Sequence, residues 1–181
     1  MKVIVPLAEG FEEIESTTII DILRRAGIDV TVAGLKEGAI KGAHGVKVTP
    51  DTVIDKVTAD NFDAIALPGG YPGFVNLGES DQVLKLVREM HAKNKLVTAI
   101  CGAPSVLGKA GVLQGKKATV FPGMENTLTG AQPSEEGVVV DGKIITSRGP
   151  GTAMEFSLKL VEVMAGKSTA EEVARNVLVK L

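Results

Sequence analysis

The sequence is poor in the residues that build disulfides and metal sites. It has one cysteine, Cys101, and two histidines, His44 and His91, among its 181 residues. A single cysteine cannot form an intramolecular disulfide or a structural zinc site, so a reducing, cytoplasmic compartment is the expected location. The two histidines are distant in sequence and form no metal-ligand cluster with the cysteine, so no metal site is expected.

Aromatic residues and long hydrophobic runs are also scarce. Aromatic residues make up 3% of the chain, tryptophan is absent, and the net charge is −2. Nucleic-acid binding is therefore disfavoured, because it requires a basic face and usually stacking aromatics. No run approaches membrane-spanning length. The apolar residues 1–7 are too short for a signal-peptide core and are predicted to form a strand.

The sequence also lacks the usual nucleotide-binding motifs. The glycine-rich segment 67–73 has neither the lysine of a P-loop nor the Gly-x-Gly-x-x-Gly pattern of a dinucleotide site. Its paired glycines, Gly69 and Gly70, would let backbone N–H groups approach a substrate oxygen. Together with the Gly102 N–H, the Gly70 N–H would then make an oxyanion hole. The alternative is a simple tight turn.

Short apolar runs alternate with helical patterns along the whole chain. This alternation is typical of a parallel sheet covered by helices on both faces. The predicted strands are residues 2–7, 29–33, 62–67, 96–101, 118–121, 137–140 and 143–147, with a small hairpin at 39–48. The predicted helices are residues 13–26, 80–93, 152–165 and 169–178, and one following Cys101. We expect one domain, residues 1–181, folded as a doubly wound α/β sandwich with ligands at the carboxyl ends of its strands.

Cys101 lies between a predicted strand and a predicted helix. Its neighbours Ala99, Gly102 and Ala103 are small, and Pro104 suits the first turn of a helix. This pattern is typical of a nucleophile elbow, in which a strained turn presents the central side chain above the sheet. The start of the following helix would favour the thiolate. The alternative is a cysteine buried in the core.

Glu15 lies on the side of the first predicted helix that should face the core. The apolar stripe of that helix is Ile19, Ile22, Leu23 and Ala26, and extending it back by one turn reaches Glu15. Glu12 and Glu13 occupy positions that can reach water. A carboxylate facing the core must be paired or neutral, so a protonated Glu15 could donate a hydrogen bond to a Cys101 thiolate. The alternative is a frayed helix start, which also suits acidic residues.

Five segments together resemble the DJ-one (ThiJ/PfpI) superfamily, specifically its parkinsonism-protein branch. They are residues 8–15, 24–34, 67–70, 99–104 and 146–152, in register and in order. The resemblance covers essentially the whole chain and implies a flavodoxin-like sandwich and a homodimer. It also implies a reactive Cys101 hydrogen-bonded to a protonated Glu15, in a pocket framed by Gly69, Gly70 and Gly102.

Three positions depart from the patterns of that superfamily. Protease-like members place a histidine directly after the nucleophilic cysteine, where this chain has Gly102, so peptidase activity is disfavoured. Some members have a pocket histidine where this chain has Phe121, which cannot transfer protons. His44 stands where relatives often have an arginine that reaches the partner's active site. Phe121 and His44 are therefore candidate pocket residues, although His44 could equally decorate a surface turn.

The resemblance implies chemistry without a cofactor on methylglyoxal-like dicarbonyls or their early adducts with amines and thiols. Cys101 would be the nucleophile and Glu15 the acid and base of a glyoxalase or deglycase. The alternative is a redox-sensing or chaperone-like stress protein, in which Cys101 is oxidised and no substrate turns over.

Overall fold

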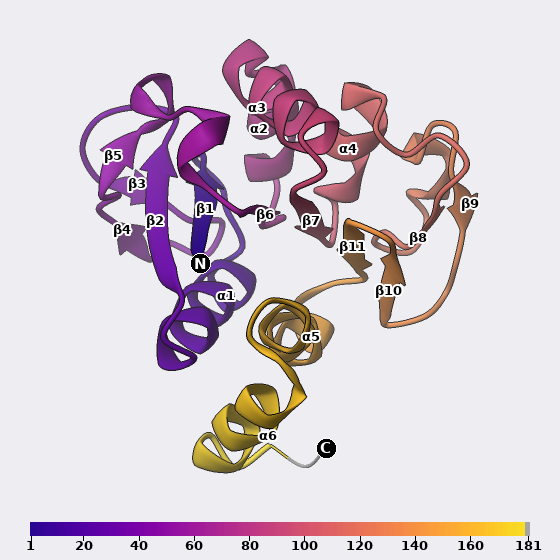
Figure 1. Cartoon of the computed structure of the whole chain (residues 1–181). Helices are drawn as coiled ribbons and strands as arrows, with labels where there is room; N and C mark the ends of the chain where they lie inside the picture. The colour runs from indigo at the N-terminus through magenta and orange to yellow at the C-terminus, as the bar shows by residue number, and fades with distance from the viewer. Residues whose placement is uncertain (180–181) are drawn as a thin grey trace.

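The computed structural model describes residues 1–179 as a central sheet between two layers of helices (Figure 1). The main sheet has seven strands in the order β10-β11-β7-β6-β1-β2-β5. All neighbouring pairs are parallel except β10 and β11, which pair antiparallel. The predicted flavodoxin-like α/β fold is confirmed.

The strands of the main sheet follow the predicted pattern closely. In chain order they are β1 (Lys2–Leu7), β2 (Asp29–Gly34), β5 (Thr52–Val53), β6 (Ala64–Leu67), β7 (Leu96–Ile100), β10 (Val138–Asp141) and β11 (Ile144–Ser147). The central strands β6 and β7 are buried along their whole length, which explains their continuous apolar sequences. The sequence analysis did not predict β5, a two-residue strand at the edge.

Among residues 1–179, each face of the sheet carries three helices and its own hydrophobic core. The helices are α1 (Glu13–Arg25), α2 (Gly73–Glu79), α3 (Asp81–Ala92), α4 (Pro104–Ala110), α5 (Ala153–Ala165) and α6 (Lys167–Asn176). Helices α2, α3 and α4 pack over one face with Ile4 and Ile65, and α1, α5 and α6 cover the other with Val3 and Val5 (Figure 1). Alternate residues of each strand thus face opposite cores.

The predicted strand at 118–121 is wrong in length and place. Only β8 (Lys117–Ala118) forms, and it pairs with β9 (Gln132–Pro133) outside the main sheet. The rest of the segment makes other contacts: the Thr119 N–H donates to Thr146 Oγ1, and the Phe121 N–H donates to the Cys101 carbonyl. Backbone groups with these partners are not available to a sheet ladder.

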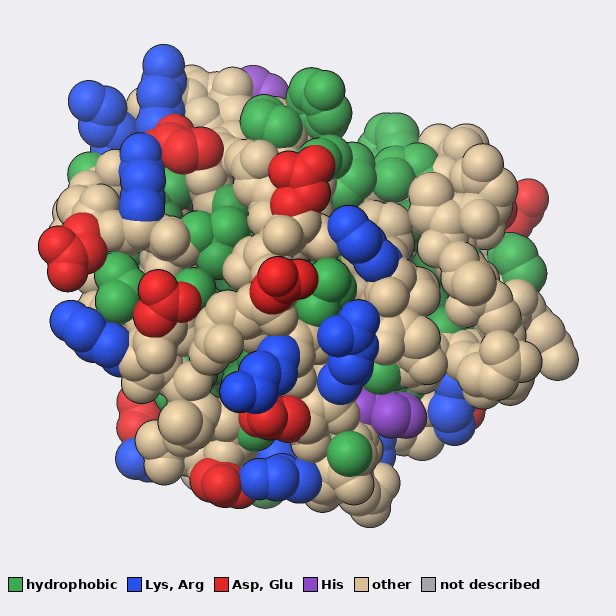
Figure 2. All heavy atoms as spheres, turned by 90° about the horizontal axis from the view of Figure 1, so that it is seen from above, with side chains coloured by type: hydrophobic (Ala, Val, Ile, Leu, Met, Phe, Trp, Pro, Cys, Tyr) green, Lys and Arg blue, Asp and Glu red, His purple; other side chains and the backbone are tan. Residues whose placement is uncertain are grey.

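The predicted hairpin at 39–48 is confirmed as β3 (Ile40–Lys41) paired antiparallel with β4 (Lys47–Val48). On the face of the molecule shown in Figure 2, acidic and basic side chains are interspersed and form no large basic patch. Within residues 1–179, no helix is both long and apolar enough to cross a bilayer.

Candidate active site

The candidate site lies where three neighbouring strands, β7, β6 and β1, end at the same edge of the sheet. Cys101 follows β7 directly, Gly69 and Gly70 follow β6, and Glu15 lies in the first turn of α1, which follows β1. The topology therefore brings Glu15 together with Gly69, which lies 54 positions away in the sequence, and with Cys101, because the carboxyl ends of parallel strands meet at one edge.

Cys101 has the backbone geometry of a nucleophile elbow. Its φ is 64°, in the left-handed region that a residue with a Cβ rarely adopts. The turn is held on both sides: the Cys101 N–H donates to the Ser147 carbonyl at 2.9 Å, and its carbonyl accepts from Phe121 at 2.8 Å. The prediction of a strained backbone at position 101 is confirmed. The strain persists because these contacts fix the turn.

Glu15 is completely buried, as predicted. Its Oε2 accepts a hydrogen bond of 2.7 Å from the Gly69 N–H, whereas its Oε1 has no partner among the described residues. A buried, unpaired carboxylate oxygen is costly, and protonation removes most of that cost. Burial raises the pKa of Glu15 to about 7, although hydrogen bonds from Gly69 and Cys101 act in the opposite direction.

The side chains of Glu15 and Cys101 lie close together beside Gly69. A Cβ at Gly69 would lie 2.9 Å from Glu15 Oε2 and 3.1 Å from Cys101 Sγ. Burial raises the pKa of the Cys101 thiol to about 12. The negative charge of Glu15 and its hydrogen bond with the thiol also raise this pKa, whereas the Gly102 and Gly70 N–H groups lower it. The prediction that the helix start favours the thiolate is therefore wrong, because burial and Glu15 together outweigh the two N–H groups. The two groups titrate as a pair that carries one negative charge at most near neutral pH.

The three predicted pocket glycines are each required by close packing. At Gly69 a Cβ would lie 2.7 Å from the Cys101 Cβ, and at Gly102 it would lie 2.6 Å from the Phe74 ring. Gly70 has a φ of 89° and packs against the backbone of Gly10 and of Glu12. The Gly70 and Gly102 N–H groups lie near enough to the sulfur to lower the pKa of the Cys101 thiol. This placement is what an oxyanion hole would need.

Of the two candidate pocket residues, Phe121 lies beside Cys101, whereas His44 contacts Glu13. Phe121 lies next to Cys101 through its backbone, and its side chain is 45% exposed beside Gly149. His44 lies in the β3–β4 hairpin, where Nδ1 contacts Glu13 Oε2 of the same chain at 3.0 Å. This contact with Glu13, followed by the charge of Glu12, raises the pKa of His44.

Glu12 and Glu13 differ from the prediction that they reach water, because each is only 8% exposed. The hairpin that covers Glu13 comes from a segment 31 residues away, and its His44 N–H donates to Glu13 Oε1 at 2.7 Å. Burial alone would raise the pKa of Glu13, but the hydrogen bonds from His44 and Val46 hold it below its usual range. Helical periodicity indicates which residues face the core beneath the helix, but it does not indicate which residues a distant hairpin covers. The burial of Glu13 was therefore not predicted.

The fold and this site define a flavodoxin-like protein with a cysteine on a nucleophile elbow beside a buried acid. The chain belongs to the DJ-1/PfpI family, whose model matches residues 1–163. It is 48% identical to Protein dj-1beta of Drosophila melanogaster over 97% of this chain and 96% of that protein. It is 35% identical to a protein of Pyrococcus abyssi named a deglycase, over 91% of this chain and 99% of that one.

Solved structures agree with the sequence matches. Toxoplasma gondii DJ-1, whose structure is described as oxidized, is 40% identical in sequence to this chain and superposes with a TM-score of 0.96 over 99% of both chains.

Two other relatives by sequence, DJ-1 homologues of Arabidopsis thaliana, are longer than this chain, which covers 40% of one and 46% of the other. The predicted family is confirmed.

Proposed function

We propose that the protein is a cofactor-independent glyoxalase or deglycase that acts on methylglyoxal-like dicarbonyls or their early adducts. The observation that carries the proposal is the buried pair of Glu15 and Cys101 on a strained turn, with two backbone N–H groups near the sulfur. Membership in a family with a relative named a deglycase supports it. The single free thiol fits a reducing compartment such as the cytoplasm.

The first step forms a bond between Cys101 and the substrate. Ionised Glu15 takes the thiol proton, and the resulting thiolate attacks the aldehyde carbon of methylglyoxal to give a hemithioacetal. The oxyanion is held by the Gly70 and Gly102 N–H groups until Glu15 returns the proton to it. The high pKa of the Cys101 thiol makes this base necessary, because few thiols would ionise unaided.

The second step moves a proton between the two carbons of the substrate. Glu15 removes the proton from the former aldehyde carbon, which gives an enediol, and delivers it to the adjacent carbon. The hydroxyl proton of the first carbon moves to the oxygen of the second, which leaves a lactoyl thioester on Cys101. The first carbon is oxidised and the second reduced, so no external oxidant is needed. Water then cleaves the thioester, which releases lactate and restores the thiol. A dicarbonyl that arrives attached to an amino group as a hemiaminal would first lose the amine, which takes the hydroxyl proton and regenerates the aldehyde, and would then follow the same steps.

A redox-sensing role is the second candidate, and the same thiol supports it. A structurally similar DJ-1 from Toxoplasma gondii is described as oxidized. A cysteine peptidase is disfavoured, because neither histidine is among the groups that act on the pKa of Cys101 and Gly102 occupies the position of the adjacent base.

Lactate production from methylglyoxal tests the proposal against the redox alternative. Wild type should form lactate with multiple turnovers, and Cys101→Ser should form none above the buffer rate. His91→Ala, which changes a histidine on α3 outside the site, is the matched control and should retain the wild-type rate. Absence of turnover in wild type, with a thiol that titrates as reduced, would favour the sensor.

We further propose that the protein acts as a homodimer joined along α1. Residues of α1 at helical spacing, Ile14, Thr17 and Thr18, form an exposed or half-buried stripe, with Ile14 56% exposed. A cavity of about 530 Å³ adjoins this stripe. It is lined by Thr17, Thr18, Asp21, Ile22, Arg25, Met154, Asn176 and Val177. An exposed isoleucine beside a groove is a suitable contact for a second copy.

A further inference from the structure

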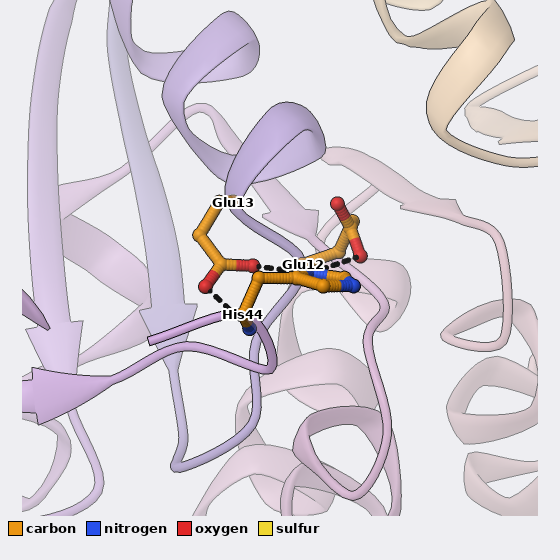
Figure 3. Close-up of side chains that lie close together, drawn as sticks. All are labelled: Glu12, Glu13 and His44. Atoms are coloured by element: carbon orange, nitrogen blue, oxygen red, sulfur yellow. Dashed lines mark hydrogen bonds and ion pairs between the residues drawn. The ribbon is translucent and has the colours of Figure 1, made fainter. Parts of the chain in front are cut away.

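The start of α1 and the β3–β4 hairpin bring two carboxylates and an imidazole together (Figure 3). Glu12, Glu13 and His44 each offer one ligand atom, and these atoms all lie within 4.8 Å of one another. The His44 Nδ1 lies 3.0 Å from Glu13 Oε2 and 3.6 Å from Glu12 Oε2. This cluster was not predicted from the sequence, because two of its three candidate ligands are carboxylates and the expectation of no metal site rested on histidine and cysteine alone.

The two carboxylates are buried without a permanent positive partner. Glu12 and Glu13 are each 8% exposed, and within residues 1–179 neither forms an ion pair with a lysine or an arginine. His44 is the one group that pairs with both. Adjacent buried carboxylates repel each other, so this position favours a bound cation.

The two carboxylates each direct one oxygen at His44. Glu13 Oε1 accepts from the His44 and Val46 N–H groups at 2.7 and 3.3 Å, which fixes the carboxylate and leaves Oε2 facing the imidazole. Glu12 Oε1 accepts from Ile14 at 3.4 Å, whereas its Oε2 accepts no hydrogen bond from the residues described. Such fixing of a carboxylate by backbone donors is how metal sites orient their ligands. Glu12 is only 8% exposed, and the 3.6 Å contact with His44 is the one polar contact of its Oε2 among the described residues, which is a second reason to expect a ligand here.

Gly42 allows the hairpin to close on this cluster. A Cβ at position 42 would collide with the Glu13 carboxylate, and the hairpin is held by the Gly42 N–H bond to Val46 at 2.8 Å. His44 remains 72% exposed on the outer side, so an ion and water can reach its ring. The cluster is therefore rigid on its carboxylate side and open on its imidazole side.

We propose that Glu12, Glu13 and His44 form a binding site for a divalent transition metal of the Zn²⁺ type, with water completing its coordination. Two ligands bound at about 2.1 Å are separated by about 3.0 Å in octahedral and about 3.4 Å in tetrahedral geometry. The observed 3.0 and 3.6 Å fall close to these values. The nitrogen donor favours Zn²⁺ over Mg²⁺ and Ca²⁺, which prefer oxygen ligands. Two carboxylates would neutralise the charge of the ion.

A metal at this site would tie the β3–β4 hairpin to the start of α1. It would stabilise the folded protein by mass action, because the three ligands meet only after folding. The site is separate from the proposed chemistry of Cys101 and Glu15, and it does not depend on the proposed function.

Calorimetric titration with Zn²⁺ tests the proposal, using Cys101→Ser protein so that the thiol cannot bind the ion. We expect one equivalent per chain at neutral pH, and no comparable binding of Mg²⁺. His44→Ala and Glu12→Gln, each added to that background, should weaken Zn²⁺ binding at least tenfold. His91→Ala is the matched control and should leave the affinity unchanged.

Nitrogen NMR of the imidazoles shows directly which histidine binds the ion, independently of the measured Zn²⁺ affinity. Zn²⁺ should shift the His44 Nδ1 resonance and leave His91 unmoved. Glu12→Gln guards against a folding artefact, because outside the cluster the Glu12 side chain makes only a long capping bond to Ile14. The proposal is overturned if the Cys101→Ser protein binds no Zn²⁺, if the His44 and Glu12 variants bind it as tightly as their parent, or if His91→Ala weakens it equally.

Discussion

At the scale of single residues, Glu15 is the group whose environment departs most from water. Its pKa of about 7 in the folded protein compares with an ordinary value of 4.5. The folded state therefore binds the proton more tightly than the unfolded state. The stability from this protonation is fully present below pH 4.5 and is lost as the pH rises to 7.

A pH series of unfolding free energies checks this sign. Between pH 4.5 and 7, wild type should lose roughly 3 kcal/mol relative to Glu15→Gln, which does not titrate, because each pKa unit is worth about 1.4 kcal/mol. Glu89→Gln on the exposed side of α3 should follow wild type. A constant difference between wild type and Glu15→Gln across this range would show that Glu15 is not protonated on folding.

Cys101 is the one thiol of the chain, and oxidation should occur there. Proton transfer to Glu15 forms the thiolate, which mild peroxide oxidises through the sulfenate to the sulfinate. Intact and peptide mass spectrometry should find two added oxygens at Cys101 and none at the corresponding position of Cys101→Ser. Oxygen gained only at methionines would mean that the thiol is not reactive.

At the scale of elements, the contact between α2 and the Cys101 turn excludes a side chain at position 102. A Cβ there would lie 2.6 Å from the Phe74 Cδ1 atom, and Phe74 belongs to α2. In this chain Phe74 therefore leaves no room for a side chain after the cysteine, and we expect the effects of substituting Gly102 and Phe74 to be coupled.

Gly102→Ala should destabilise the protein by about 1 to 3 kcal/mol, which is typical of overpacking. Adding the substitution to a Phe74→Ala background should cost clearly less, because the obstructing ring is gone. Gly151→Ala is the matched control, since nothing lies within 4 Å of its Cβ position, and it should be nearly neutral. Chemical denaturation of the four variants measures these differences. Equal costs in both backgrounds would refute the coupling.

Helix α2 also shows the limit of sequence patterns for single elements. Its seven residues include Gly73 and Gly78, which are poor helix formers, and the sequence analysis placed Gly73 in a loop. Helices α1, α3, α5 and α6 have clear periodicity or caps and were predicted to within a few residues. Short elements such as β5 and α2 depend on tertiary contacts that no local pattern contains.

At the scale of the whole molecule, the alternation of strands and helices was enough to predict the architecture. It was also enough to bring Cys101, Glu15 and the glycines to one edge, because parallel topology fixes where strands end. The burial of Glu13 and its cluster with His44 could not be predicted. They depend on how a hairpin folds back over 31 residues, and helical spacing within α1 contains no information about that contact.

The proposed homodimer is tested by light scattering at micromolar concentration. Wild type should have twice the mass of the 18.9 kDa chain, and Thr18→Arg should shift it toward the monomer by placing a charge in the α1 contact. Lys85→Glu on α3, away from α1, should remain dimeric. A monomeric wild type would refute the dimer.

The central claim is that Glu15 and Cys101 work as one site, with Glu15 moving the protons. The most direct measurement is the kcat for lactate formation from methylglyoxal by Glu15→Gln, with its fold checked by circular dichroism and its Cys101 checked by thiol titration. An amide in this position can still accept from the Gly69 N–H but cannot transfer a proton, so kcat should fall at least about 100-fold. A folded Glu15→Gln protein with an intact thiol and a kcat within twofold of wild type would contradict the claim.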